Sequence, residues 1–235
     1  MNQLVKTNYS KFILVSHARS GSNLLLSTLN SHPDIVAEPE IFAGHNRNKE
    51  EDFYPILNNL FCERPQNVKA VGCKIFYYHL NKDEWQELSK ITDLKVIHLI
   101  RKNKLSMITS MKVAFKTDQW GIKNESERID VSKKQIHINN EALRDSFVQI
   151  DSWQSETNNL FKNHQIKEVF YEDFVDNFKE SINEIYDFMG LPKVSDKNIR
   201  IKHKKQNPEP LNQLIKNYSE LKQSFENTPW QHYFV

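Results

Sequence analysis

The chain has 235 residues, with 32 Lys and Arg against 30 Asp and Glu, so its formal net charge is only +2. This near balance argues against a polybasic nucleic-acid binder. Hydrophobic residues make up 38% of the chain and aromatic residues 11%, which suffices for a full core and excludes an intrinsically disordered protein. The length suits one larger domain or a domain with an appended subdomain, and we predict a single domain over residues 1–235.

The chain carries no sequence mark of a membrane or secreted protein. No run of about 18 uncharged apolar residues occurs, and the beginning of the sequence lacks the apolar run and cleavage site of a secretory signal. Cys62 and Cys73 are too few for a disulfide framework and do not form a CxxC pair. We therefore expect a cytoplasmic protein with reduced cysteines.

The first half of the chain alternates between strand and helix patterns. Short apolar, β-branched runs predict strands over residues 11–15, 35–37, 69–78 and 95–100. Between them we predict a helix over 23–32, one beginning at Asn81 with Glu84 completing a capping box, and one over 104–116 capped by Asn103. A polar stretch near residues 46–51 is predicted to be a surface insertion. This order favours an α/β fold with a central parallel sheet flanked by helices.

The second half is predicted to be mainly helical. Residues 118–134 are charged and show no clean period, so we expect a loop there. A long helix from residue 139 through 160, a strand over 168–171 and a helix ended by Gly190 and Pro192 follow. After a basic polar segment, one further helix is predicted from Leu211 through Leu221.

The loop between the first strand and the first helix is a candidate anion site. Its sequence, from residue 16 to 23, is SHARSGSN. Backbone N–H groups and the helix dipole favour an anion at such a position, and Arg19 adds one positive charge. A phosphate-binding loop is therefore one interpretation, and an ordinary helix-capping turn is the other.

This loop departs from the nucleotide-binding pattern G-x-x-x-x-G-K-[ST]. If Gly21 is its second glycine, Ser22 stands where the lysine belongs and Asn23 where the magnesium-binding hydroxyl belongs. Elsewhere, His17, His79 and His98 show no metal-ligand spacing. We therefore expect no metal, which disfavours a phosphoryl-transfer enzyme that uses a nucleoside triphosphate.

A second candidate anion site follows the strand over 95–100. Arg101 comes directly after that strand, and Ser110 lies on the next helix, on the same face as Ser106. A guanidinium and a hydroxyl in this arrangement suit a phosphate, although each residue alone could be structural. Two anion sites after neighbouring strands suggest a ligand with two separated phosphates.

Two carboxylates follow the second predicted strand, in the segment AEPEIF. Glu38 and Glu40 would lie at the carboxyl edge of the sheet, where ligands of parallel α/β sheets bind. A carboxylate beside an anion-binding loop is electrostatically awkward unless it accepts a proton, as a general base does. Either residue could be such a base, and both could equally be solvated surface groups.

At this point the chain resembles a known family. Its segments HARSGSNLLLSTLNSHPDIVAEPEIF, VIHLIRKNKLSMITSMKVAFKTDQW, VFYEDFVDNFKESINEIYDFMGLP and KHKKQNPEPLNQLIKNYSEL are similar, in order, to those of sulfotransferases that use 3′-phosphoadenosine 5′-phosphosulfate (PAPS). The likeness is to bacterial carbohydrate sulfotransferases of the Stf-zero and nodulation-factor type. It implies a three-layer, P-loop-like α/β fold and sulfuryl transfer without a metal.

The resemblance also implies roles for the candidate residues. The first segment resembles the 5′-phosphosulfate loop, which assigns the 5′-phosphate and sulfuryl end to Arg19, Ser20, Gly21, Ser22 and Asn23. The second resembles the 3′-phosphate site, with Arg101 and Ser110 as its pair. Glu38 or Glu40 aligns with the family's general base, with a slight preference for Glu38. Lys74 is a candidate to steady the transferring group, and residues 202–206 resemble the loop that covers the nucleotide.

The predicted function is transfer of a sulfuryl group from PAPS to a hydroxyl of a sugar or glycolipid, which leaves adenosine 3′,5′-bisphosphate (PAP). A kinase-like phosphoryl-transfer enzyme and a non-catalytic nucleotide-binding module are the alternatives. The acceptor pocket is predicted from residues 42–62 and 118–134, and Trp120 is a candidate to line it.

Overall fold

The computed structural model describes residues 7–47, 53–122, 124–194 and 206–234. The chain divides into two compact units. The first contains residues 1–100 and 156–201, and we call it the sheet unit. The second contains residues 101–155 and 202–235, and we call it the helical unit. No helix in the described ranges is both long enough and apolar enough to cross a membrane.

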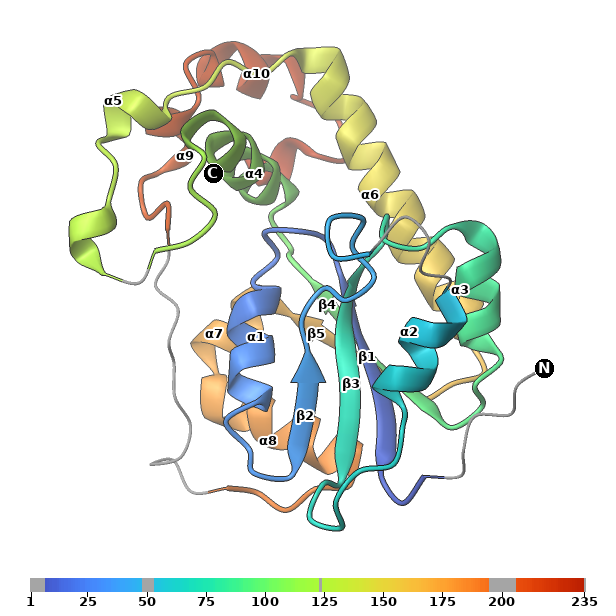
Figure 1. Cartoon of the computed structure of the whole chain (residues 1–235). Coiled ribbons are helices and arrows are strands. Elements are labelled where there is room, and N and C mark those ends of the chain that lie inside the picture. Colours follow the sequence, from blue (N-terminus) through green and yellow to red (C-terminus); the bar gives the residue numbers. More distant parts are fainter. Residues whose placement is uncertain (1–6, 48–52, 123, 195–205, 235) are drawn as a thin grey trace. The chain divides into compact units, whose positions relative to one another are not determined.

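The sheet unit is built on five parallel strands in the order β2-β3-β1-β4-β5 (Figure 1). These strands are β1 (Ser10–Ser16), β2 (Ile35–Glu38), β3 (Ala70–Phe76), β4 (Leu94–Ile100) and β5 (Ile166–Phe170). Each prediction of a strand is confirmed to within a few residues. Because all five strands run the same way, the segments that follow β1, β2 and β3 emerge at one edge of the sheet.

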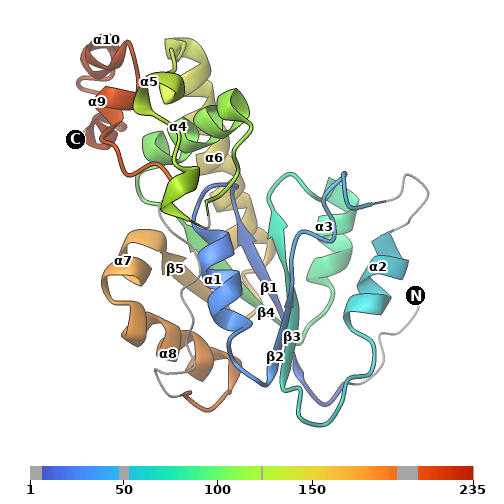
Figure 2. The same ribbon diagram turned by 60° about the vertical axis from the view of Figure 1, so that its left-hand side comes forward.

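Helices cover both faces of this sheet, which confirms the three-layer α/β fold (Figures 1 and 2). One face carries α1 (Ser22–Leu29), α7 (Tyr171–Asp176) and α8 (Phe178–Met189), and the other carries α2 (Phe53–Leu60) and α3 (Lys82–Ser89). Leu25 of α1 and Ile182 of α8 join Phe12 and Leu14 of β1 in one buried cluster. This apolar contact fixes α1, and with it the loop before α1, against the sheet.

The helical unit packs around a separate apolar cluster. Its elements are α4 (Lys104–Thr117), η1 (Glu125–Glu127), α5 (Val131–Lys134), most of α6 (Asn140–Leu160), α9 (Leu211–Leu214), α10 (Tyr218–Ser224) and η3 (Gln231–Tyr233). Ile108 of α4, Phe147 of α6 and Phe225 after α10 are fully buried together. As predicted, the Asn103 side chain caps α4 by accepting a hydrogen bond from the Ser106 backbone N–H, and Asn81 forms a capping box with Glu84 on α3.

Two predictions of local structure were wrong, and one helix was not predicted. That helix is α2, formed by residues 53–60. Residues 118–134 contain the short helices η1 and α5 rather than only loop. The helix predicted from Leu211 through Leu221 is broken, because Ile215 leaves the helical path to form a parallel bridge with Ile136.

Candidate active site

The loop between β1 and α1 turns sharply at two residues with positive φ. Arg19 has φ 66° and Gly21 has φ 91°. The Ser20 hydroxyl is buried and donates a hydrogen bond to the His17 carbonyl over 2.7 Å, which holds the turn together. Gly21 is the N-cap of α1, so the first-turn amides of Ser22 and Asn23 point out of the helix end beside this turn. The arrangement matches the concave backbone sites that bind anions.

Gly21 is required by both its backbone angle and its surroundings. A Cβ atom built on Gly21 would lie 2.2 Å from Cδ2 of Tyr171, the first residue of α7. Since φ 91° is also unfavourable for residues with a Cβ, any substitution strains the turn. The Tyr171 ring therefore closes one side of the loop, and only glycine fits against it.

Lys74 of β3 joins two of the predicted site residues. Its side chain is almost fully buried, yet Nζ lies 2.7 Å from Oε1 of Glu40 and donates a hydrogen bond to Oδ1 of Asn23. Nζ also lies 5.1 Å from the centroid of the Phe76 ring. One ammonium group thus holds the carboxylate that follows β2 beside the first turn of α1.

His79 completes this cluster. The Phe76 backbone N–H donates to Nδ1 of His79 over 3.1 Å, so a neutral imidazole carries its proton on Nε2, which lies 3.8 Å from Oε2 of Glu40. Burial lowers the pKa of His79 to about 4, although Glu40 opposes the shift. Burial also lowers the pKa of Lys74, again against the effect of Glu40. At neutral pH, His79 is therefore uncharged.

Glu38 lies on the opposite face of the sheet from this cluster. It pairs in register with Cys73 on β3, whereas Lys74 is the next residue and points the other way. Burial raises the pKa of the Cys73 thiol, and the nearby Glu38 carboxylate adds to the effect. The two glutamates of AEPEIF thus have different neighbours, and only Glu40 contacts Lys74.

Tyr78 connects the loop after β1 with the loop after β3. Its ring makes an edge contact with the His17 ring, with 5.7 Å between centroids, and another with the His79 ring at 5.4 Å. The side chain is nevertheless 48% exposed. An aromatic surface therefore stands beside the Glu40 cluster at the carboxyl edge of the sheet.

The predicted 3′-phosphate pair belongs to the helical unit. Arg101 directly follows β4, and Ser110 is on α4. Ser110 Oγ lies 3.4 Å from Nδ2 of Asn207, which donates to it. Of the predicted nucleotide-covering segment, residues 202–205 lie outside the described residues and Gln206 lies within them.

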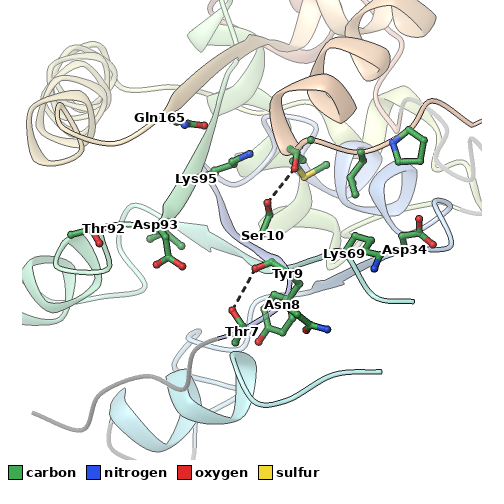
Figure 3. Close-up of a pocket in the computed structure, with 15 residues that line it drawn as sticks. Thr7, Asn8, Tyr9, Ser10, Asp34, Lys69, Thr92, Asp93, Lys95 and Gln165 are labelled. Carbon is green, nitrogen blue, oxygen red and sulfur yellow. Dashed lines mark hydrogen bonds between the residues drawn. The ribbon is translucent and has the colours of Figure 1, made fainter. Parts of the chain in front are cut away.

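A cavity of about 860 Å³ occurs in the sheet unit, at the amino ends of the strands and thus at the opposite edge of the sheet from the anion loop and Glu40 (Figure 3). Its lining includes the first residues of β1 and β4 and the end of α8. Two of its polar groups are engaged within the protein. Lys95 Nζ donates to the Phe188 carbonyl over 2.8 Å, and the Ser10 hydroxyl donates to the Met189 carbonyl over 3.2 Å. We therefore centre the candidate site on the loop after β1.

The sequence pattern singled out Lys74, Glu40 and Asn23 individually but did not reveal their mutual contact. It also missed His79, for which the sequence showed only that it has no metal-ligand spacing. The residues after the strand, Tyr77, Tyr78 and His79, are an unusual aromatic run at a carboxyl strand end. That run is a sequence signal that could have pointed to His79.

Comparisons with known proteins agree with this fold. A family model described as "Sulfotransferase domain" matches residues 9–234. Nodulation protein H of Rhizobium meliloti is 26% identical over 243 residues, which covers 95% of this chain and 94% of that protein. Nodulation protein H of Rhizobium tropici is 23% identical over 235 residues, with 95% and 92% covered.

Two solved structures share the fold at low sequence identity. A sulfotransferase from Alicyclobacillus acidocaldarius has a TM-score of 0.51 at 16% identity and covers 94% of this chain and 92% of its own. A sulfotransferase domain from the curacin biosynthetic pathway has a TM-score of 0.55 at 13% identity, with 96% and 89% covered. Because the family model spans nearly the whole chain, this protein belongs to the sulfotransferase family, and the predicted class of PAPS-dependent sulfotransferase is confirmed.

Proposed function

We propose that the protein transfers a sulfuryl group from PAPS to a hydroxyl of a carbohydrate or glycolipid, with Glu40 as the general base. The observation that carries this proposal is the contact of Lys74 with both Glu40 and Asn23. It brings a carboxylate to the helix end that the anion-binding loop precedes. A base and an anion site are the two parts that sulfuryl transfer to a hydroxyl requires.

The loop after β1 fits the 5′ end of the nucleotide. Positive φ at Arg19 and Gly21 turns the backbone into a concave surface, and the outward N–H groups of Ser22 and Asn23 supply donors. Ser20 supports the turn through its bond to His17 rather than through a free hydroxyl. When bound, PAPS supplies an activated sulfuryl group and leaves as PAP.

Glu40 takes the proton of the acceptor hydroxyl as the hydroxyl oxygen attacks sulfur in line with the departing 5′-phosphate. A bond from oxygen to sulfur forms while the bond from sulfur to the 5′-phosphate breaks. Lys74 positions Glu40 and places a positive charge near the transferring group, where negative charge redistributes. Since Glu38 faces the other side of the sheet, we assign the base to Glu40, against the slight preference from the sequence.

Arg101 and Ser110 are proposed to hold the 3′-phosphate through a guanidinium and a hydroxyl. On this proposal the sheet unit and the helical unit act as one catalytic domain over residues 1–235. The family model supports this, since it includes residues of both units.

A carbohydrate acceptor is supported by the resemblance to nodulation-type carbohydrate sulfotransferases and by the similarity to Nodulation protein H. The helical unit adds an exposed aromatic pair, Phe115 and Trp120, whose rings meet edge to face with 4.9 Å between centroids. Exposed aromatic faces of this kind often mark binding surfaces.

The kinase-like alternative is disfavoured by the neighbours of Asn23. Asn23 stands where a magnesium-binding hydroxyl would be, but its carboxamide oxygen accepts a hydrogen bond from the Lys74 ammonium. A cationic side chain at this position repels a divalent metal ion.

Two measurements test the proposal. With EDTA present to remove metal ions, PAP should raise the melting temperature. In a separate measurement without EDTA, ATP with magnesium should raise the melting temperature no more than ATP alone does. Transfer of labelled sulfate from PAPS should then be followed across mono- and oligosaccharides, glycolipids, sterols and phenols. Stabilisation only by ATP with magnesium would favour the kinase-like alternative, and transfer only to phenols or sterols would refute the carbohydrate acceptor.

A further inference from the structure

Two segments of the helical unit that are far apart in the sequence are fastened together. The Ile136 backbone N–H donates to the Leu214 carbonyl, and the Lys216 N–H donates to the Ile136 carbonyl, each over 2.8 Å. The Asn217 side chain bonds to both backbone groups of Ile138. The segment that follows the predicted nucleotide-covering loop is thus held against residues 136–138, just after residues 118–134.

A buried lysine strengthens this connection. Lys134 is only 1% exposed, and its Nζ lies 2.7 Å from Oε1 of Glu209. The same Nζ donates to the Gln206 carbonyl over 3.4 Å. Burial of a lysine without a partner is costly, so this side chain strongly favours the conformation in which both acceptors are present.

The residue between these two acceptors that reaches the proposed nucleotide site is Asn207. Its Nδ2 donates to Ser110 Oγ over 3.4 Å. A carboxamide nitrogen has two N–H donors, so Asn207 can bond Ser110 with one and an oxyanion with the other. Glu209, close by in the chain, would repel that anion if its charge were not compensated by Lys134.

We propose that Lys134 is a positioning residue for recognition of the nucleotide's 3′-phosphate. Its contacts with the Gln206 carbonyl and the Glu209 carboxylate, on either side of Asn207 in the chain, fix the Asn207 amide beside Ser110. Its charge also neutralises Glu209. This inference rests on the proposed role of Arg101 and Ser110. The buried Lys134 contact does not touch the nucleotide. It sets the preference for a nucleotide that carries a 3′-phosphate over one that lacks it.

The test compares binding of PAP with binding of adenosine 5′-phosphate, which lacks the 3′-phosphate, by calorimetry. For Asn207→Ala and Lys134→Met, we expect PAP affinity to fall about tenfold, the effect of one hydrogen bond to a charged group, while adenosine 5′-phosphate affinity changes by less than about twofold. Lys134→Arg keeps the charge and should recover part of the preference for PAP.

Lys104→Met is the matched control. Lys104 is a second buried lysine of the helical unit and pairs with Asp151, and within the described residues its side chain contacts neither Ser110 nor Asn207. It should leave the ratio of the two affinities unchanged. If Lys134→Met does not fold, Lys134→Met with Glu209→Leu removes both buried charges and should fold, yet still lose the preference for PAP.

An unchanged affinity ratio in the Lys134 and Asn207 variants, or an equal loss for both nucleotides, would overturn the inference. The proposed function fails in a different way. If the wild type itself does not prefer PAP, and Arg101→Met changes neither affinity, the 3′-phosphate site is not where we place it.

Discussion

Two buried lysine–glutamate pairs, one in each unit, look alike but have different surroundings. Lys74 and Lys134 are each 1% exposed, and each places Nζ 2.7 Å from a glutamate oxygen. The glutamate side chains are also similar in exposure, 24% for Glu40 and 19% for Glu209. Contact geometry alone therefore does not separate a catalytic pair from a structural one.

The neighbours of the two pairs do separate them. Lys74 sits near the carboxyl end of β3, and its partner Glu40 also faces His79 and lies beside the helix end after the anion loop. Lys134 ends the short helix α5, and its other acceptor is a backbone carbonyl. The first pair connects titratable groups at a sheet edge, whereas the second connects two chain segments.

The largest predicted effect comes from replacing the glutamate of each pair, which tests whether the two pairs differ in function. Glu40→Gln removes the general base and should lower kcat by about 10²- to 10⁴-fold at saturating PAPS. Glu38→Gln, on the other face of the sheet, and Glu209→Gln, in the Lys134 pair, should keep kcat within about twofold of the wild type. The measurement is turnover with the best acceptor from the panel.

Two results would contradict this assignment. A large loss in Glu38→Gln with normal turnover in Glu40→Gln would return the base to Glu38. A comparable kcat loss in Glu209→Gln would mean that the Lys134 pair is as important for turnover as the Lys74 pair. Circular dichroism and melting temperature of each variant distinguish lost chemistry from lost folding.

The second prediction uses His79, the histidine that faces Glu40 of the Lys74 pair. The pKa of His79 falls from 6.5 to about 4 on folding, so the unfolded chain binds the extra proton between these values. The folded state favours neutral His79, so the stability that depends on this neutral form is complete above pH 6.5. It is lost as the pH falls towards 4.

Urea unfolding at pH 7 and pH 4 measures that loss. Between these pH values the free energy of unfolding should fall by about 1 to 3 kcal/mol more in the wild type than in His79→Gln, the lower figure allowing for solvent screening. His137→Gln, which changes an exposed histidine of the helical unit, should behave like the wild type. Equal pH dependence in the wild type and His79→Gln would show that His79 is not held neutral by burial.

Much of the fold was predictable because local signals agreed with the tertiary structure. The strand β1, the capping box of Asn81 and the Asn103 cap each depend on short-range chemistry that the sequence displays. The break at Ile215 was not predictable, because its cause is a backbone bridge to Ile136, 79 residues earlier. Periodicity reports which side chains are apolar and does not report such long-range pairing.

The candidate site was predictable in its parts and not in its connections. The carboxyl-edge rule placed Glu38, Glu40 and the loop of Arg19 at one end of the sheet. The choice between the glutamates depended on strand register, which pairs Glu38 with Cys73 and leaves Lys74 for Glu40. A shift of one residue would exchange those faces, and nothing local in AEPEIF fixes the register.

The smallest predicted effect separates acceptor binding from nucleotide binding within the helical unit. Trp120, in residues 118–134, is 46% exposed. Its ring contacts the ring of Phe115 on α4, which is 69% exposed. If this pair stacks on a sugar acceptor, Trp120→Ala should raise the acceptor KM by about three- to tenfold and leave kcat unchanged, since a stacking contact is made equally in the ground and transition states. Trp120→Phe should retain most of the affinity.

The decisive readout is the split between the two substrates. Trp120→Ala should leave PAP affinity unchanged, whereas Lys134→Met should weaken PAP binding and change the acceptor KM little when PAPS is saturating. Val148→Ala, at an exposed apolar position on α6, is the control for loss of surface area alone. If Trp120→Ala weakened PAP binding as much as acceptor binding, residues 118–134 would serve the nucleotide throughout, and the acceptor surface would have to lie elsewhere.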